Sequence, residues 1–592
     1  MLRADRVLMQ LSDTNLKGTL FTGGKNYRQY FVLFSVLILS VCMYGIYSIV
    51  GFSYYPDEFG YWSSAAANIG YDWSEVASLG SYYSFGYSLI LTPILYFFRG
   101  GLAAYRAAVV VNMLLHAGSV WLLGGIARRL CPKAKNMDIV YAVGIAVFYP
   151  VWIFFVQGTL AEALIAFLYV LICYFFALIL EKPSVITVIA LVISLVYICC
   201  VHMRTISIVI AAFIILMLWA WNTPAYRKFI IIILGIGVAG VAAIVIVKTM
   251  VTTNVYGEAD KAKLAGNTFA GQIYTFKYLF TLEGIMGIIQ GIAGKIYYLG
   301  MASFGLFYVA VYYLGRKFIL LMKGVFFEKR EIEPQEMLCS FLFLSMLGQF
   351  AVTALYMNKV SGPHEIFYGR YNEYILPVFM MVAVLIITQD GRCIKRLFIS
   401  ALVSVITCAV GTLYAQRLGM TNMHAYFVAG ISYIWEPNNF NLSTDLWISL
   451  IVGIEFMCIV FACLYGYKIK GLGQYLLNFV IAGEIVLGLL LCTNNTYVSS
   501  RVDRNDLQVF RYIDSEENKE LPVQYLAEND HTFIDLIQFY MEDRKIDVIR
   551  DESEIIPGSL LIIDVESPSL DSIMEKYELC KETAWFNLFR TN

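Results

Sequence analysis

Apolar runs long enough to cross a membrane recur along most of this chain and constrain its fold more than any other feature. A helix needs about 20 apolar residues to cross the ~30 Å hydrocarbon core of a bilayer. The first run is not a signal peptide, because it is too long and no A-x-A cleavage site follows it. The sequence predicts thirteen spans, at residues 30–50, 105–127, 138–156, 160–180, 184–201, 205–221, 229–247, 290–314, 338–357, 372–388, 397–414, 446–466 and 474–493.

The composition agrees with a membrane protein and excludes other classes. Hydrophobic residues make up 59% and charged residues 15% of the chain, against about 45–50% and 25% in soluble proteins. The 43 basic residues do not outnumber the 44 acidic ones, so no cationic excess is available to bind nucleic acid. The 12 cysteines lie mostly in apolar runs and show no metal-ligand spacing, which favours a role as small buried hydrophobes.

The end of the chain differs from the rest. Residues 494–592 hold 31 of the 87 charged residues. Within them, short apolar runs at 522–526, 546–549 and 560–565 are typical of strands, and 531–541 and 569–577 are typical of helices. The predicted fold class is an all-α polytopic membrane domain over residues 1–493, followed by a small soluble α/β domain over residues 494–592.

Lysine and arginine set the expected orientation. With the N-terminus in the cytoplasm, the cytoplasmic segments hold 22 of the 43 basic residues and the longer outer segments only 11. This excess follows the positive-inside rule. An odd number of spans then places the C-terminal domain outside the cytoplasm, in a multi-pass protein of the cell membrane.

Under this topology, the unusual ionisable residues all fall near the outer membrane surface. Ionisable groups near membrane depth are costly, so their placement is informative. Each has a structural interpretation when taken alone, such as a solvated loop acid, a helix-dipole partner or a snorkelling anchor. Their conjunction favours a site made of Asp57, Glu58, Glu162, His202, Arg204, His364, Glu365, Arg370 and Glu373.

This combination of groups indicates a definite chemistry. One of two adjacent acids can accept a proton while the other positions a hydroxyl or holds a metal. Arginine and histidine at a membrane surface suit a lipid-linked phosphate, because guanidinium matches phosphate geometry. A site with both is what glycosyl transfer from a polyprenyl-phosphate-linked sugar requires.

At these residues the chain resembles the GT-C superfamily of membrane glycosyltransferases, which includes protein O-mannosyltransferases, aminoarabinose transferases and arabinosyltransferases. The resemblance covers nearly the whole chain by layout. It rests on YYPDEFGYW at 54–62, YYSFGYSLILTPIL at 82–95, GTLAEAL at 158–164 and YGRYNEYILP at 368–377. The chain lacks a WWDYG-type signature in its tail, which argues against transfer of a whole oligosaccharide to asparagine.

The candidate residues fall into three roles, of which the resemblance implies the general base at Asp57 and the binding of the donor phosphate by Arg204 and Arg370. Asp57 matches the general base after the first span, and Glu58 is its catalytic neighbour. Arg204, Arg370, His202 and His364 are candidates for binding the donor phosphate, and Glu162, Tyr371 and Glu373 for positioning the substrate. The implied activity is inverting transfer of a sugar from a polyprenyl-phosphate-linked donor to an extracytoplasmic acceptor, which is an envelope glycan, a lipid or a protein.

Two alternatives remain open at this stage. A glycan polymerase or ligase of another fold explains the outer acids and arginines but does not require an acidic pair after the first span. A lipid-linked glycan transporter or flippase would distribute charges through both membrane halves and often shows repeated halves. No cofactor is certain from the sequence. A divalent metal is also open, with Asp57 and Glu58 as its only suggested ligands.

Overall fold

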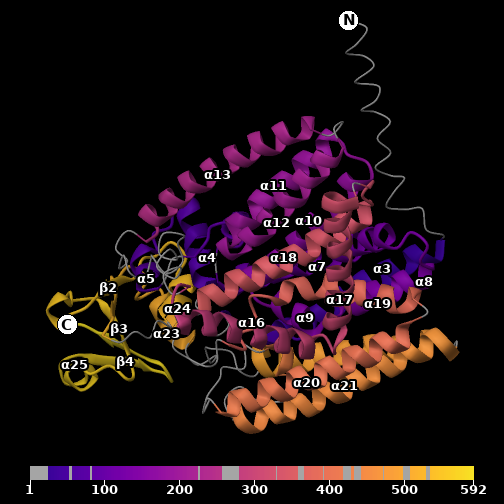
Figure 1. Cartoon of the computed structure of the whole chain (residues 1–592). Coiled ribbons are helices and arrows are strands. Elements are labelled where there is room, and N and C mark those ends of the chain that lie inside the picture. The colour runs from indigo at the N-terminus through magenta and orange to yellow at the C-terminus, as the bar shows by residue number, and fades with distance from the viewer. Residues whose placement is uncertain are drawn as a thin grey trace, which may run out of the picture.

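The protein consists of a long helical bundle with a small sheet at one end (Figure 1). It is described here by a computed structural model. The described residues are 25–52, 57–80, 83–99, 101–223, 227–256, 279–328, 330–357, 366–390, 392–417, 429–432, 442–470, 473–497, 507–528 and 534–592.

Within these ranges, nine helices are long and apolar enough to cross a membrane. This supports a multi-pass membrane protein and confirms the predicted fold class of the bundle. They comprise α3 (Lys25–Met43), α7 (Gly101–Leu130), α10 (Ala161–Glu181), α12 (Ile206–Asn222), α13 (Lys228–Asn254), α16 (Leu282–Ala302), α18 (Pro334–Met357), α21 (Leu442–Lys470) and α22 (Gly473–Cys492).

The other predicted spans are helical but differ in detail. Residues 138–156 form two helices, α8 (Asn136–Val147) and α9 (Pro150–Val156), bent by 53°. The bend falls at Pro150, which has no N–H to continue the hydrogen-bond ladder of α8. Three further segments are helices outside the nine, namely α11 (Val185–Val201), α19 (Leu376–Gln389) and α20 (Cys393–Arg417).

The prediction of one continuous helix over 290–314 is wrong. Helix α16 ends at Ala302, and α17 (Leu306–Lys323) begins after a break. Phe304 and Gly305 have φ angles of 53° and 78° within this break. Left-handed backbone cannot continue a right-handed helix, so the chain starts a new helix at this point.

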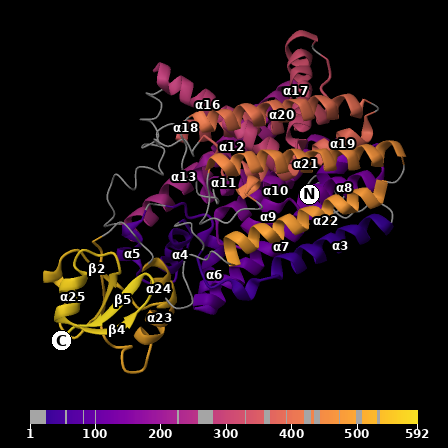
Figure 2. The ribbon, with the colours of Figure 1, turned by 90° about the horizontal axis from the view of Figure 1, so that it is seen from below.

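Three short helices connect α3 to α7 and lie near the sheet end of the bundle (Figure 2). They are α4 (Asp57–Asn68), α5 (Ser74–Leu79) and α6 (Ser88–Phe98). Helix α4 is almost wholly buried, whereas α6 exposes Tyr96, Phe97 and Phe98. An apolar helix with exposed aromatic residues is suited to lie in the interface of the membrane.

The C-terminal part contains a mixed five-stranded sheet in the order β2-β1-β3-β5-β4. Strands β1 (Val523–Leu526), β2 (Asp547–Ile549) and β3 (Leu560–Asp564) are parallel neighbours and confirm the three predicted strands. The antiparallel strands β4 (Glu578–Glu582) and β5 (Phe586–Arg590) were not predicted. Strand β4 reads ELCKE and is largely exposed at the sheet edge, so it lacks the apolar alternation that identifies a strand. Helices α23 (Leu507–Ile513), α24 (Ile534–Tyr540) and α25 (Leu570–Lys576) accompany the sheet.

Helix α24 packs directly against the short helices after α3. The Phe539 ring lies 4.9 Å from the rings of Phe52 and Trp62, centroid to centroid, and 6.0 Å from that of Trp73. The Trp73 indole N–H also donates to the Glu542 carbonyl at 2.6 Å. The C-terminal part is therefore joined to the bundle through the same helices that follow the first span.

We expect Phe539→Ala to destabilise this junction. Phe539 is fully buried, and removing a buried phenylalanine ring costs about 3–5 kcal/mol. Limited proteolysis of the purified protein should show faster cleavage around α24 in this variant. The matched control is Met574→Ala, because Met574 is exposed. Equal resistance of both variants to proteolysis around α24 would contradict the prediction.

Candidate active site

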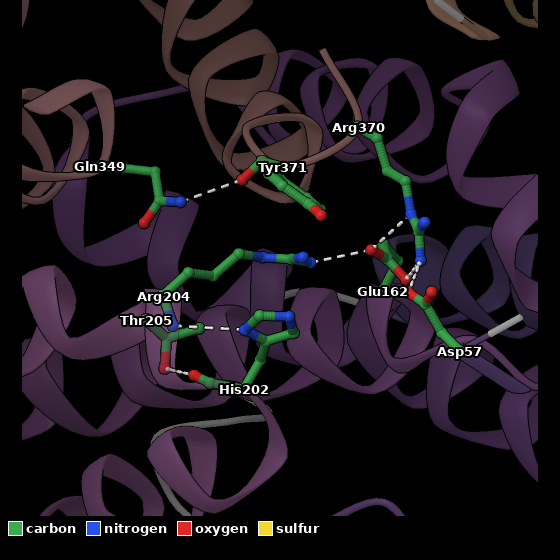
Figure 3. Close-up of polar contacts among 8 residues, drawn as sticks. All are labelled: Asp57, Glu162, His202, Arg204, Thr205, Gln349, Arg370 and Tyr371. Carbon is green, nitrogen blue, oxygen red and sulfur yellow. Dashed lines mark hydrogen bonds and ion pairs between the residues drawn. The ribbon is translucent and has the colours of Figure 1, made fainter. Parts of the chain in front are cut away.

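Four charged side chains from distant parts of the chain meet in one cluster (Figure 3), which includes the first residue of α4. Helix starts and tight turns position all four. They are Asp57 at the first residue of α4, Glu162 in the first turn of α10, Arg204 in the 3-10 turn Met203–Thr205, and Arg370 just before the 3-10 turn Glu373–Ile375.

Glu162 is the centre of this cluster. Arg370 donates to both of its oxygens, from Nε to Oε1 at 2.8 Å and from Nη2 to Oε2 at 3.2 Å. Arg204 Nη2 donates to Oε1 at 2.8 Å. The three residues are only 3–5% exposed, so the carboxylate compensates two guanidinium groups that are removed from water.

Asp57 completes the cluster on its more open side. It accepts a hydrogen bond from Arg370 Nη2 through Oδ2 at 2.7 Å, and its side chain is 16% exposed. Among the described residues, no donor contacts its second oxygen, Oδ1. Two carboxylates thus face two guanidinium groups, while Asp57 Oδ1 can still accept a hydrogen bond from a further group.

Arg204 has unused hydrogen-bonding capacity. Its Nε and Nη1 atoms are buried and have no partner among the described residues. Its guanidinium carbon lies 4.2 Å from the centre of the Tyr371 ring, which holds the group flat. Buried donors are nearly always satisfied in folded proteins, so these two nitrogens indicate a place for an acceptor-rich ligand.

Gln349 in α18 fixes the position of Tyr371 and was not predicted from the sequence. Its amide Nε2 donates to the Tyr371 carbonyl at 3.0 Å, and its Oε1 accepts from the Ser207 hydroxyl at 2.9 Å. A glutamine inside the apolar run 338–357 is the signal that could have identified it, because a buried amide in a span needs polar partners.

His202 lies beside Arg204 but contributes a neutral ring. Its Nδ1 accepts from the Arg204 backbone N–H at 3.3 Å. Burial and the adjacent Arg204 guanidinium lower the pKa of His202 well below its ordinary value. The imidazole therefore caps the turn that carries Arg204 and does not add a positive charge to the cluster.

Glu58 points into a different network from its neighbour Asp57. Its Oε2 accepts from the Tyr105 hydroxyl at 2.6 Å, from the Thr159 backbone N–H at 3.0 Å and from the Thr159 hydroxyl at 2.6 Å. The Trp62 indole N–H donates to the same hydroxyl at 3.1 Å. These bonds tie the start of α4 to the segment before α10, which places Asp57 opposite Glu162.

Glu373 is buried three residues beyond Arg370. It accepts hydrogen bonds from the hydroxyls of Tyr298 and Tyr149, and it lines a small internal cavity together with Glu162. His364 and Glu365 lie outside the described residues. Among the described residues, no group of three or more acidic, histidine or cysteine side chains is arranged to hold a metal ion.

Fold and site together define a multi-pass helical membrane protein with a buried, charge-balanced cluster at one end of its bundle. No protein-family model matches the sequence, and no curated protein matches it. The comparison with solved structures is informative instead.

The chain is similar in fold to ArnT from Cupriavidus metallidurans. One ArnT structure is bound to undecaprenyl phosphate and another is in the apo state. They align over 96% and 95% of this chain and 98% of their own, with TM-scores of 0.52 and 0.51 and identities of 10% and 11%. The archaeal oligosaccharyltransferase AglB from Archaeoglobus fulgidus aligns over 92% of this chain and 70% of its own, with a TM-score of 0.44 and 10% identity. The ArnT structures thus confirm the predicted fold class, a polytopic helical membrane domain followed by a small α/β domain.

Proposed function

We propose that this protein is a membrane glycosyltransferase that moves a sugar from a polyprenyl-phosphate-linked donor to an acceptor hydroxyl. The acceptor is an envelope glycan, a lipid or a protein, and transfer inverts the configuration of the sugar. The proposed site faces the extracytoplasmic side together with residues 494–592, and the N-terminus is cytoplasmic.

The observation that carries this proposal is the unequal use of the two arginines. Arg370 donates from both Nε and Nη2 to Glu162 and Asp57, whereas Arg204 keeps two buried nitrogens without a described partner. The free N–H donors of a buried guanidinium match the oxygens of a phosphate. Arg204 is therefore the proposed contact for the donor phosphate, with Tyr371 holding it in place and Arg370 adding positive charge nearby.

Asp57 is the proposed general base. The acceptor hydroxyl would hydrogen-bond to its Oδ1, lose its proton to the carboxylate and attack the anomeric carbon. A new carbon–oxygen bond to the acceptor forms as the bond to the phosphate oxygen breaks. The electron pair leaves with polyprenyl phosphate, whose charge Arg204 stabilises.

The two alternatives are less well supported. A polymerase or ligase of another fold conflicts with the likeness to ArnT over nearly the entire chain. A transporter would require ionisable groups along a path through the membrane, whereas the charged pairs of this site gather at one end of the bundle.

The direct test is transfer by the purified protein in lipid vesicles. Polyprenyl-phosphate-linked sugars would be supplied with extracts of envelope glycans, lipids or proteins, and free polyprenyl phosphate would be measured. A deletion strain should accumulate the cognate polyprenyl-phosphate-linked sugar. Release of no polyprenyl phosphate with any donor, together with an unchanged lipid profile in the deletion strain, would reject the proposal.

We expect Arg204→Lys to raise the KM for the donor by roughly 10–100-fold while kcat changes less. Lysine keeps the charge but loses the planar guanidinium with its two free N–H donors and the stacking on Tyr371. Steady-state kinetics with varied donor concentration measures the effect. The exposed Arg227→Lys is the control, and an unchanged donor KM for Arg204→Lys would remove the phosphate role.

A further inference from the structure

A groove of about 350 Å³ lies between α17 and α20, far from the candidate active site. The segment Glu373–Gln389 runs from the site toward this groove. Its helical rise of 1.5 Å per residue separates the two ends by roughly 25 Å. Asp390 and Arg392 follow directly, so the groove opens at the opposite end of the bundle.

Four cations line one end of this groove. Arg396 forms an ion pair with Asp390 at 2.7 Å. Arg316, Arg392 and Lys395 are exposed and, among the described residues, have no ion-pair partner. Three uncompensated positive charges around one hollow favour an anion there.

The rest of the groove is apolar. It extends from Arg392, just before α20, to Val403 in α20, a distance of roughly 17 Å at the helical rise. Ile399 and Val403 on this wall are 46% and 37% exposed. Tyr312 lies at the boundary between the cationic end and the apolar wall, because the Arg396 guanidinium carbon is 5.8 Å from the centre of its ring. A groove with a cationic end and an exposed apolar wall is complementary to an amphiphile with an anionic headgroup.

A second hollow at the same end provides a contrast. It has a volume of about 480 Å³ and is lined by Arg128 and Arg129, but also by Glu181 and Glu333. Arg129 is paired with Glu181 at 2.7 Å. Its charges are balanced by its own residues, so it has no comparable preference for an anion.

We propose that the groove between α17 and α20 binds a phospholipid with an anionic headgroup. The headgroup contacts Arg316, Arg392 and Lys395, and one acyl chain lies along Ile399 and Val403. The lipid belongs to the leaflet opposite the candidate active site. This site is independent of the proposed transferase activity.

Native mass spectrometry of the detergent-solubilised full chain tests this proposal. The protein is titrated with phosphatidylglycerol and, separately, with phosphatidylcholine. The wild-type protein should retain one phosphatidylglycerol in preference to phosphatidylcholine. The triple variant Arg316→Gln, Arg392→Gln, Lys395→Gln should bind it about 100-fold more weakly, because each cation near an anionic lipid contributes about a factor of five.

The matched control removes three exposed cations outside the groove, in Lys133→Gln, Lys135→Gln, Arg227→Gln, and should keep the wild-type preference. Ile399→Trp fills the apolar wall without changing charge and should also lose the lipid, which provides a second test if the triple variant does not fold. Equal retention of phosphatidylglycerol by the groove variants and the control variant would overturn the proposal. Displacement of phosphatidylglycerol by equimolar polyprenyl phosphate would overturn it as well, since the groove would then bind the isoprenoid lipid.

Discussion

Asp57→Asn should lower kcat by roughly 10²–10⁴-fold, the usual loss when a general base is removed. Asparagine has nearly the same shape as aspartate, and its Oδ1 can still accept the hydrogen bond that Arg370 Nη2 donates at 2.7 Å. It cannot take a proton from the acceptor hydroxyl. The variant should therefore fold, bind donor and transfer almost nothing.

Single-turnover transfer and donor binding by the purified protein separate these effects. Glu58→Gln is the matched control, because Glu58 is the adjacent acid but accepts its hydrogen bonds from Tyr105 and Thr159. A glutamine carbonyl can accept the same bonds, so we expect a loss of less than about tenfold. Near-normal turnover of Asp57→Asn would show that Asp57 is not the general base. A loss of turnover in Glu58→Gln alone would instead assign the general base to Glu58.

Glu162→Gln should have the largest effect on stability. Glu162 is 3% exposed and is the shared partner of Arg204 and Arg370. Removing its charge leaves an excess of positive charge in a buried site, and breaking a buried pair in this way costs about 3–5 kcal/mol. Thermal unfolding in detergent should show a clear fall in the transition midpoint.

Helix α10 supplies its own control for this prediction. Glu181 at the other end of the helix pairs with Arg129 at 2.7 Å, but its side chain is 54% exposed. An exposed pair contributes about 0–1 kcal/mol, so Glu181→Gln should unfold almost like the wild-type protein. The double variant Glu162→Gln, Arg204→Met should recover part of the loss. Equal midpoints for the Glu162 and Glu181 variants would show that the cluster is not a buried ion network.

The sequence predicted the helical bundle well because length and apolarity suffice to identify a span. It failed where local backbone geometry interrupts an apolar run. The bend before Pro150 and the left-handed residues Phe304 and Gly305 divide two predicted spans without changing their hydropathy. Strand β4 was missed for the opposite reason, since an exposed edge strand carries charges in place of an apolar pattern.

The candidate site was predictable in its membership but not in its internal pairing. Charge at membrane depth identified Asp57, Glu162, Arg204 and Arg370, and the structure brings all four together. Adjacency in sequence suggested that Glu58 shares the site, but successive residues of a helix point about 100° apart. The neutral state of His202 and the contribution of Gln349 depend on burial and on contacts between distant helices, which no single segment of sequence reveals.

The junction of α24 with the short helices after α3 has a consequence for how the protein matures. Phe539 packs on Trp62, whose indole N–H donates to the threonine that holds Glu58 beside Asp57. This support comes from α24, which the ribosome delivers long after α4. A nascent chain can therefore insert its earlier helices while the start of α4, which carries Asp57, still lacks its aromatic backing. With Asp57 as the proposed general base, we expect transfer activity only in chains that include α24, and none in chains that end before it.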